Sequence, residues 1–206
     1  NMKNGDVLFF IANKEETVAS KFAGQIRTFL GQKLNLIDPN KFELCIINNF
    51  PMYEWNEEAR KFDFGHNPFS MPQGGMDSLL HQNTEDILAY QYDFVCNGYE
   101  MASGAVRNHD IEVMKKAFEI AGYPEEEVKT RFGALYNAFQ YGTPPHAGAA
   151  PGLDRMVMLV ADSKNIREVI AFPKNKKARD LLMRAPSRVH EQQLRDVHIR
   201  IVEKEK

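Results

Sequence analysis

Two apolar segments on either side of Gly98 limit most strongly what this chain can fold into. Residues 89–97 and 99–107 are rich in strand-forming residues, and one glycine separates them. So short a connection joins two strands in antiparallel orientation, because a parallel pair needs a long crossover. The sequence therefore predicts an antiparallel sheet built around this hairpin, with alternate side chains on one face.

The start of the chain predicts a strand followed by a long helix. Residues 6–12 form a short apolar run of strand formers. Asn13 and Glu16 then have the spacing of a helix start, in which each side chain can bond a free backbone N–H group. From Val18 to Leu34 apolar residues recur every three or four positions, so we expect one face of this helix to be buried.

The remaining segments predict a mixed α/β (α+β) fold with one candidate domain boundary. The turn cluster that begins at Asp38 separates a small domain over 1–38 from a larger one over 39–206. In the larger domain we expect a buried strand over 44–50 and then a hairpin with its tip at 55–58 and its second strand ending near Phe64. Further along we expect a helix capped by Asp110 and ended by Gly122, and a second helix that opens at Pro124. The last segments are an apolar stretch over 156–161 and an alternating run over 197–202.

The composition is that of an ordinary globular protein. The 206 residues are 43% hydrophobic and 26% charged, which excludes a disordered tail and a disulfide-stapled miniprotein. With 26 basic and 28 acidic residues the formal charge is −2, so any contact with nucleic acid must be local. Cys45 and Cys96 lie in apolar runs, and we expect both to be reduced core residues. No apolar run reaches the roughly 20 residues that cross a bilayer, and the polar start has no signal-peptide pattern, so we expect a cytoplasmic protein.

Two carboxylates on the predicted hairpin are candidate metal ligands. Asp93 and Glu100 lie on neighbouring strands joined through Gly98. A tight turn can bring both to one face, where a pair of hard oxygen ligands suits Mg²⁺ held together with nucleotide phosphates. The alternative is a pair of solvated strand carboxylates, and spacing alone leaves both interpretations open.

Arg107 could point to the same face as the two carboxylates if its strand contains a bulge. Arg107 ends the strand that Glu100 begins, and an odd separation places the two on opposite faces of a regular strand. A bulge near Ser103–Gly104 would restore a common face, since glycine inside a strand often marks one. An inward Arg107 could hold a carboxylate through two parallel hydrogen bonds; otherwise it is a surface charge.

Three further segments are candidates for ligand contact. His66 lies in a proline- and glycine-rich loop over 65–75, where an imidazole can donate to a carboxylate or transfer protons. Asp154 and Arg155 follow a glycine that permits close approach of a ligand. A basic patch within 174–188 could meet phosphates. Each segment also has an ordinary interpretation, as an exposed histidine, a structural turn and a solvated face.

Several strings of residues follow one another in an order that matches a known family. They are Phe50-Pro51-Met52, His66-Asn67-Pro68-Phe69, Asn97-Gly98-Tyr99-Glu100, Tyr141-Gly-Thr-Pro-Pro-His-Ala-Gly148 running into Gly152-Leu-Asp-Arg155, and Ile166-Arg-Glu-Val-Ile-Ala-Phe-Pro173. Together they resemble the C-terminal part of a bacterial-type aspartyl-tRNA synthetase, a class II aminoacyl-tRNA synthetase, over about residues 5–202. The resemblance implies the second half of the catalytic domain, a class II synthetase-like antiparallel sheet flanked by helices over 39–206. It also implies the end of an α+β insertion domain over 1–38.

The resemblance implies a nucleotide site. Arg155 corresponds to the arginine of motif 3 that stacks on adenine and contacts the γ-phosphate of a bent ATP. Gly152, Leu153 and Asp154 correspond to the adjoining wall of the ATP site. Glu100, together with Asp93, matches the carboxylates that bind ATP through Mg²⁺.

An amino-acid site is implied beside it. Arg107 corresponds to the arginine that pairs with the side-chain carboxylate of aspartate, and His66 to the loop histidine at the amino-acid site. Many relatives have a second histidine where this chain has Asn67, which puts in doubt any role that needs an imidazole there.

The activity implied is that of an aspartate–tRNA ligase. ATP activates L-aspartate to aspartyl-adenylate, and the aspartyl group then passes to tRNA(Asp), in a cytoplasmic homodimer without membrane contact. Motif 1, motif 2 and an anticodon-binding barrel are not found in these residues, so we expect the chain alone to be inactive. Two alternatives stay open: a non-catalytic paralogue or binding module of the same fold, and a sibling class II enzyme that charges asparagine or lysine.

Overall fold

The computed structural model describes residues 2–202, which form two compact units that meet between Glu43 and Leu44 in the chain. We had placed the domain boundary nearby, at Asp38. The assignment of the first unit to an insertion domain and of the second to a catalytic domain stays a prediction.

The first unit contains the helix α1 (Glu16–Lys33) and irregular segments. Residues 6–12 are irregular, so the predicted strand is wrong; a strand needs a partner for its backbone groups, and α1 is the one regular element described within residues 2–43. The predicted cap is also wrong, because Asn13 Oδ1 accepts from the backbone N–H of Glu15 at 2.9 Å and Glu15 is the N-cap residue. No residue of α1 is buried, since the described residues of this unit leave its apolar face partly exposed.

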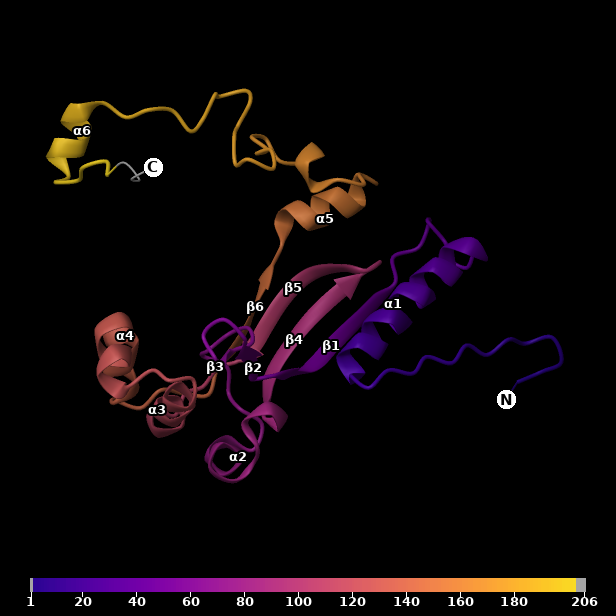
Figure 1. Ribbon diagram of the computed structural model, residues 1–206, viewed down its shortest axis with the longest axis horizontal. Helices are drawn as coiled ribbons and strands as arrows, with labels where there is room; N and C mark the ends of the chain where they lie inside the picture. Colours follow the sequence, from indigo (N-terminus) through magenta and orange to yellow (C-terminus); the bar gives the residue numbers. More distant parts are fainter. Residues whose placement is uncertain (1, 203–206) are drawn as a thin grey trace. The chain divides into compact units, whose positions relative to one another are not determined.

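The second unit is built on a four-stranded antiparallel sheet in the order β1–β4–β5–β6 (Figure 1). The strands are β1 (Leu44–Pro51), β4 (Leu88–Cys96), β5 (Tyr99–Val106) and β6 (Ala147–Pro151). Asn97 and Gly98 connect β4 to β5 with positive φ angles of 49° and 84°, the backbone of a two-residue hairpin turn. The predicted hairpin is therefore confirmed, and with it the fold class, an antiparallel sheet flanked by helices.

Strand β1 is an edge of the described sheet. We expected it to be buried, but its first six residues are exposed, so that prediction is wrong. Cys45 is exposed with them, whereas Cys96 is buried as expected. The apolar sequence of β1 identified a strand correctly, but burial depends on what covers the strand.

A second, two-stranded sheet pairs β2 (Tyr53–Asn56) with β3 (Lys61–Phe64). Its turn lies at 57–60, later than the predicted tip, because Trp55 pairs with Phe62 inside the hairpin. The loop that follows gives way to two elements that we did not predict, the helix α2 (Gly75–His81) and the 3-10 turn η1 (Thr84–Asp86).

The helices α3 (Ile111–Ile120) and α4 (Glu125–Phe139) form the predicted helical hairpin. Asp110 caps α3, with its Oδ1 accepting from the N–H groups of Glu112 and Val113 at 2.8 and 3.2 Å, as predicted. The core of this unit lies where α3 and α4 meet α2, η1 and the β2–β3 hairpin. Its buried apolar residues form two clusters, namely Met52, Tyr53, Leu79, Ile87, Ala89, Val113, Ala117 and Ala121, and Met114, Phe118, Val128, Tyr136 and Phe139.

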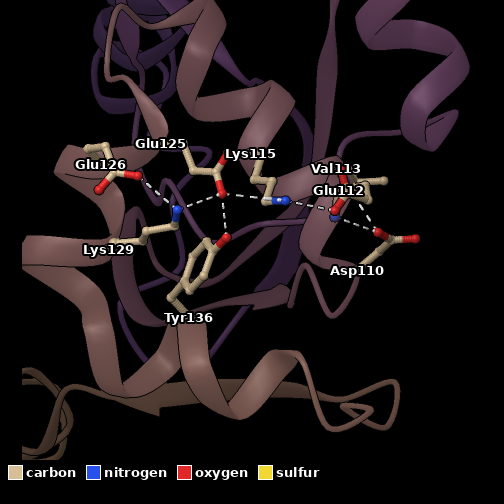
Figure 2. A network of polar contacts seen from close by, with 8 residues as sticks. All are labelled: Asp110, Glu112, Val113, Lys115, Glu125, Glu126, Lys129 and Tyr136. Carbon is tan, nitrogen blue, oxygen red and sulfur yellow. Dashed lines mark hydrogen bonds and ion pairs between the residues drawn. The ribbon is translucent and has the colours of Figure 1, made fainter.

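A polar network ties α3 to α4 on the outside (Figure 2). Glu125 accepts a hydrogen bond from the Tyr136 hydroxyl and forms ion pairs with Lys115 of α3 at 3.5 Å and Lys129 at 3.1 Å. The bond from Tyr136 and then the one from Lys129 lower the pKa of Glu125 to about 2. The network joins the two helices of the hairpin and is therefore part of the scaffold.

The end of the described chain runs through α5 (Leu153–Val160), the 3-10 turn η2 (Ile166–Glu168) and α6 (Glu191–Asp196). The apolar stretch over 156–161 thus belongs mostly to a helix, and the alternating run over 197–202 is irregular. Among the described residues, no helix combines the length and apolar character that a membrane crossing requires.

Candidate functional site

A cavity of about 380 Å³ lies on one face of the four-stranded sheet. Four charged or titratable residues that the sequence singled out line it: His66, Asp93, Glu100 and Arg107. The remaining wall comes from Phe50, Asn67, Gln91, Ser103, Gly104, Gly148, Ala149 and Ala150. The β4–β5 hairpin therefore supplies most of the polar groups, and β6 supplies a wall of small residues.

A bulge in β5 brings Glu100 and Arg107 to the same face. Phe94 pairs with Ala102, but the next residue, Val95, pairs with Glu100, so Met101 is the extra residue. One extra residue reverses the alternation of side chains, and the odd spacing of Glu100 and Arg107 becomes compatible with a common face. We predicted this bulge near Ser103–Gly104; it exists, but at Met101.

Gly104 has a different function, which is to allow close packing. A Cβ at this position would lie 2.5 Å from Cε2 of Tyr92 and closer still to the carbonyl oxygen of Gly148. The Tyr92 hydroxyl donates to that same carbonyl at 3.1 Å. The absence of a side chain at Gly104 thus lets Tyr92 lie across β5 and hold β6, which carries the small-residue wall.

The two carboxylates line the same cavity, and the charge of one acts on the other. Burial raises the pKa of Asp93, and the nearby charge of Glu100 raises it further, while His66 and Arg155 lower it. A divalent cation would relieve this repulsion, and carboxylate oxygens are suitable ligands for Mg²⁺. Within residues 2–202 no three His, Cys, Asp or Glu side chains group as metal ligands.

Arg155, near the start of α5, reaches the same strand. Its Nη1 donates to the backbone carbonyl of Glu100 at 2.7 Å and lies 3.3 Å from Glu100 Oε1. Gly152 fixes the start of this helix by donating its N–H to the Met101 carbonyl at 2.7 Å. Arg155 thus lies beside Glu100, but it is not among the residues that line the cavity. Gly152, Leu153 and Asp154 do not line it either, and Leu153 and Asp154 are exposed.

Arg107 forms no ion pair with any residue that the structure describes. Its backbone N–H bonds the His146 carbonyl at 2.9 Å, which fixes the end of β5. In the described part of the chain its guanidinium has no ion pair, although it lines a cavity that also holds two carboxylates. This fork of donors is therefore available for an anionic ligand.

The sequence did not single out Gln91 as a member of the site. This buried residue of β4 lies two positions before Asp93 and faces the cavity with it. Its Nε2 donates to the Asn67 carbonyl at 3.2 Å and to the Ser70 hydroxyl at 2.8 Å. A polar residue at an inward position of a strand is a signal that could have identified it.

The comparison with known families decides what kind of protein this is. The sequence profile of the family "tRNA synthetases class II (D, K and N)" matches residues 11–176. The chain belongs to this family. The resemblance stated from the motifs is thereby confirmed.

Members of the family named aspartate--tRNA(Asp/Asn) ligase are similar to most of this chain. That of Rhodopseudomonas palustris (strain BisB18) is 58% identical over 200 residues, which cover 97% of the chain and 34% of that relative. That of Erythrobacter litoralis (strain HTCC2594) is 59% identical over 198 residues, covering 96% and 33%. The chain therefore spans about a third of the length of the curated relatives it matches.

Solved structures of the family are more distant. The aspartyl-tRNA synthetase from Entamoeba histolytica is 23% identical and gives a TM-score of 0.49, over 84% of this chain and 29% of that one. The asparaginyl-tRNA synthetase of the same organism, in complex with asparaginyl-adenylate, is 17% identical and gives a TM-score of 0.47, over 66% and 26%.

Proposed function

We propose that the protein to which this chain belongs is an aspartate–tRNA ligase that uses ATP and Mg²⁺. The observation that carries the proposal is the cavity, which combines two carboxylates, one of which raises the pKa of the other, with an arginine that has no ion pair among the described residues. The first feature fits a metal–nucleotide complex and the second fits a carboxylate substrate. The name of the relatives at 58–59% identity agrees with both.

Asp93 and Glu100 are proposed to hold Mg²⁺ together with the phosphates of ATP. When bound, the ion would neutralise phosphate charge and make the α-phosphorus accessible to an anionic nucleophile. Arg155, beside Glu100, is proposed to stack on adenine and contact the γ-phosphate. Gly152, Leu153 and Asp154 are proposed as the adjoining part of the nucleotide site.

Arg107 is proposed to select aspartate. Its guanidinium can hold the side-chain carboxylate through two parallel hydrogen bonds, while His66 approaches the amino acid from the loop. Asparagine carries no charge and would leave the guanidinium unpaired, so it should bind more weakly. This preference distinguishes the proposal from an enzyme that charges asparagine or lysine.

The proposed reaction has two steps. The α-carboxylate of aspartate attacks the α-phosphorus of ATP, so that aspartyl-adenylate forms and pyrophosphate leaves. A terminal hydroxyl of the tRNA then attacks the carbonyl carbon, so that the ester forms, AMP leaves and the hydroxyl proton is released. The residues of this chain contribute by positioning and by charge, which are the dominant factors in such chemistry.

Aspartate-dependent exchange of pyrophosphate into ATP tests the proposal. The full product of the gene that encodes this chain should catalyse exchange with aspartate, and far more weakly with asparagine or lysine. The chain alone should not, because it spans about a third of its relatives. A full product that binds neither ATP·Mg²⁺ nor aspartate would instead support a non-catalytic binding module.

Three further properties belong to the same proposal. The full product should be a homodimer, which light scattering measures, and it should act in the cytoplasm without membrane contact. Because the relatives are named for both tRNA(Asp) and tRNA(Asn), charging should be measured with both tRNAs.

A further inference from the structure

The loop that carries His66 is shaped by a tight turn over residues 67–70. The Ser70 N–H bonds the Asn67 carbonyl at 3.2 Å, and the Phe69 N–H bonds Asn67 Oδ1 at 2.9 Å. Asparagine at the first position and Pro68 at the second are the residues such a turn favours. Asn67 therefore uses its side chain to build the turn.

The far end of this turn is fixed to the sheet through the backbone. The Asn108 N–H bonds the Phe69 carbonyl at 2.8 Å, and the Met71 N–H bonds the Val106 carbonyl at 2.9 Å. These bonds hold residues 69–71, on the side away from His66. On the near side, the Gly65 N–H bonds the Met52 carbonyl at 3.1 Å, and the His66 ring packs edge-on against Phe50 of β1 with ring centroids 5.0 Å apart. The link from Asn67 to β4 is made by a side chain.

Gln91 supplies that link. One amide nitrogen donates to the Asn67 carbonyl and to the Ser70 hydroxyl, so a single side chain holds both ends of the turn. Gln91 is 6% exposed and Ser70 is fully buried, so water does not readily replace these bonds. Because Gln91 shares β4 and a face with Asp93, it connects the loop of His66 to the strand of the acidic pair.

We propose that Gln91 is a positioning residue, which fixes the 66–70 loop against β4 so that His66 faces the amino acid. The inference rests on the proposed function for its effect on substrate. The glutamine amide provides two N–H donors at this distance, one for each acceptor, without adding a charge. Leucine has a similar size but no donor, and glutamate presents an acceptor to the Asn67 carbonyl.

Steady-state pyrophosphate exchange by the full product tests the effect on the substrate. Gln91→Leu and Gln91→Glu should each raise the KM for aspartate about tenfold, the size expected for one buried hydrogen bond. The KM for ATP should change less than about twofold. A merely structural role would lower the active fraction, and so kcat, while leaving the KM for aspartate unchanged; that result would overturn the proposal.

Gln73 provides the matched control. Its Nε2 also makes two bonds, to Asn49 Oδ1 at 3.0 Å and to the Ala89 carbonyl at 3.3 Å, but it does not line the cavity. Gln73→Leu should leave the KM for aspartate unchanged. A tenfold rise in this variant as well would show that any loss of an amide on this sheet disturbs the site, and would count against Gln91.

Hydrogen exchange gives a reading that does not depend on activity. In the full product, peptides covering 66–70 should exchange about tenfold faster in Gln91→Leu than in the wild type, and unchanged in Gln73→Leu. Ser70→Ala, which removes one of the two acceptors, should lie between them and serves if Gln91→Leu does not fold. If exchange at 66–70 in Gln91→Leu is the same as in the wild type, the inference is overturned, even if the full product proves inactive. If exchange in Gln91→Leu is faster but the wild-type full product is inactive, only the proposed function is rejected.

Discussion

Replacing Arg107 by glutamine in the full product removes the charge that we propose selects aspartate. The guanidinium lines the cavity, is partly buried and has no acidic partner among the residues that the structure describes. Its loss would leave the carboxylate of aspartate unpaired in a partly desolvated site, at a cost of about 3 kcal/mol. That free energy corresponds to a rise of about 150-fold in the KM for aspartate. The KM for ATP should change less than about threefold, because we propose that Arg107 contacts the amino acid and not the nucleotide.

Pyrophosphate exchange with aspartate and with asparagine, over a range of each amino acid, measures this effect. The variant should lose most of its preference for aspartate, because asparagine never used the charge. Arg131→Gln is the matched control, since Arg131 lies exposed on α4 in an ion pair with Glu127 at 2.8 Å. Equal losses for aspartate and asparagine, or a KM for aspartate raised less than threefold, would refute the assignment of Arg107.

Four other outcomes follow from the structure. Asp93→Asn in the full product should raise the Mg²⁺ concentration that gives half-maximal exchange by about tenfold or more. Titration of Mg²⁺ at saturating ATP measures this concentration, and an unchanged value removes Asp93 from the metal site. Gly104→Ala should destabilise the chain by about 1–3 kcal/mol in urea unfolding, whereas Gly133→Ala, with open space around its Cβ, should not; equal effects contradict the packing argument. Because the pKa of Glu125 in the folded protein is lowered to about 2, its contribution to stability is present above pH 4.5 and is lost as the pH falls toward 2. Glu125→Gln should therefore flatten the pH dependence of the melting temperature between these pH values. A curve for the variant that runs parallel to the wild-type curve contradicts this. The isolated chain should form particles that grow with concentration in light scattering, because β1 is an uncovered edge whose apolar residues are exposed; a monomer at every concentration excludes this.

Local sequence predicted the elements whose signals are local. Gly98 indicated the β4–β5 hairpin and Asp110 the start of α3, because a turn and a helix cap depend on residues next to each other in the chain. The sequence did not predict β6, since Ala147–Pro151 consists of small residues and proline and becomes a strand through pairing with β5. Nor could periodicity say that the apolar faces of α1 and β1 are exposed, because coverage depends on other parts of a protein.

In the candidate site, too, the sequence indicated the residue types but not the contacts between residues distant in the chain. Asp93, Glu100, Arg107 and His66 could be proposed from their residue types, and all four line one cavity. Glu100 and Arg107 share a face because of a bulge whose position could not be predicted from the sequence, since the extra residue is Met101 and not a glycine. Glycine at 104 marks instead the place where Tyr92 crosses β5, a contact between residues distant in the chain. A glycine in a strand thus signals close approach as readily as a bulge, and only the partner strand decides between the two.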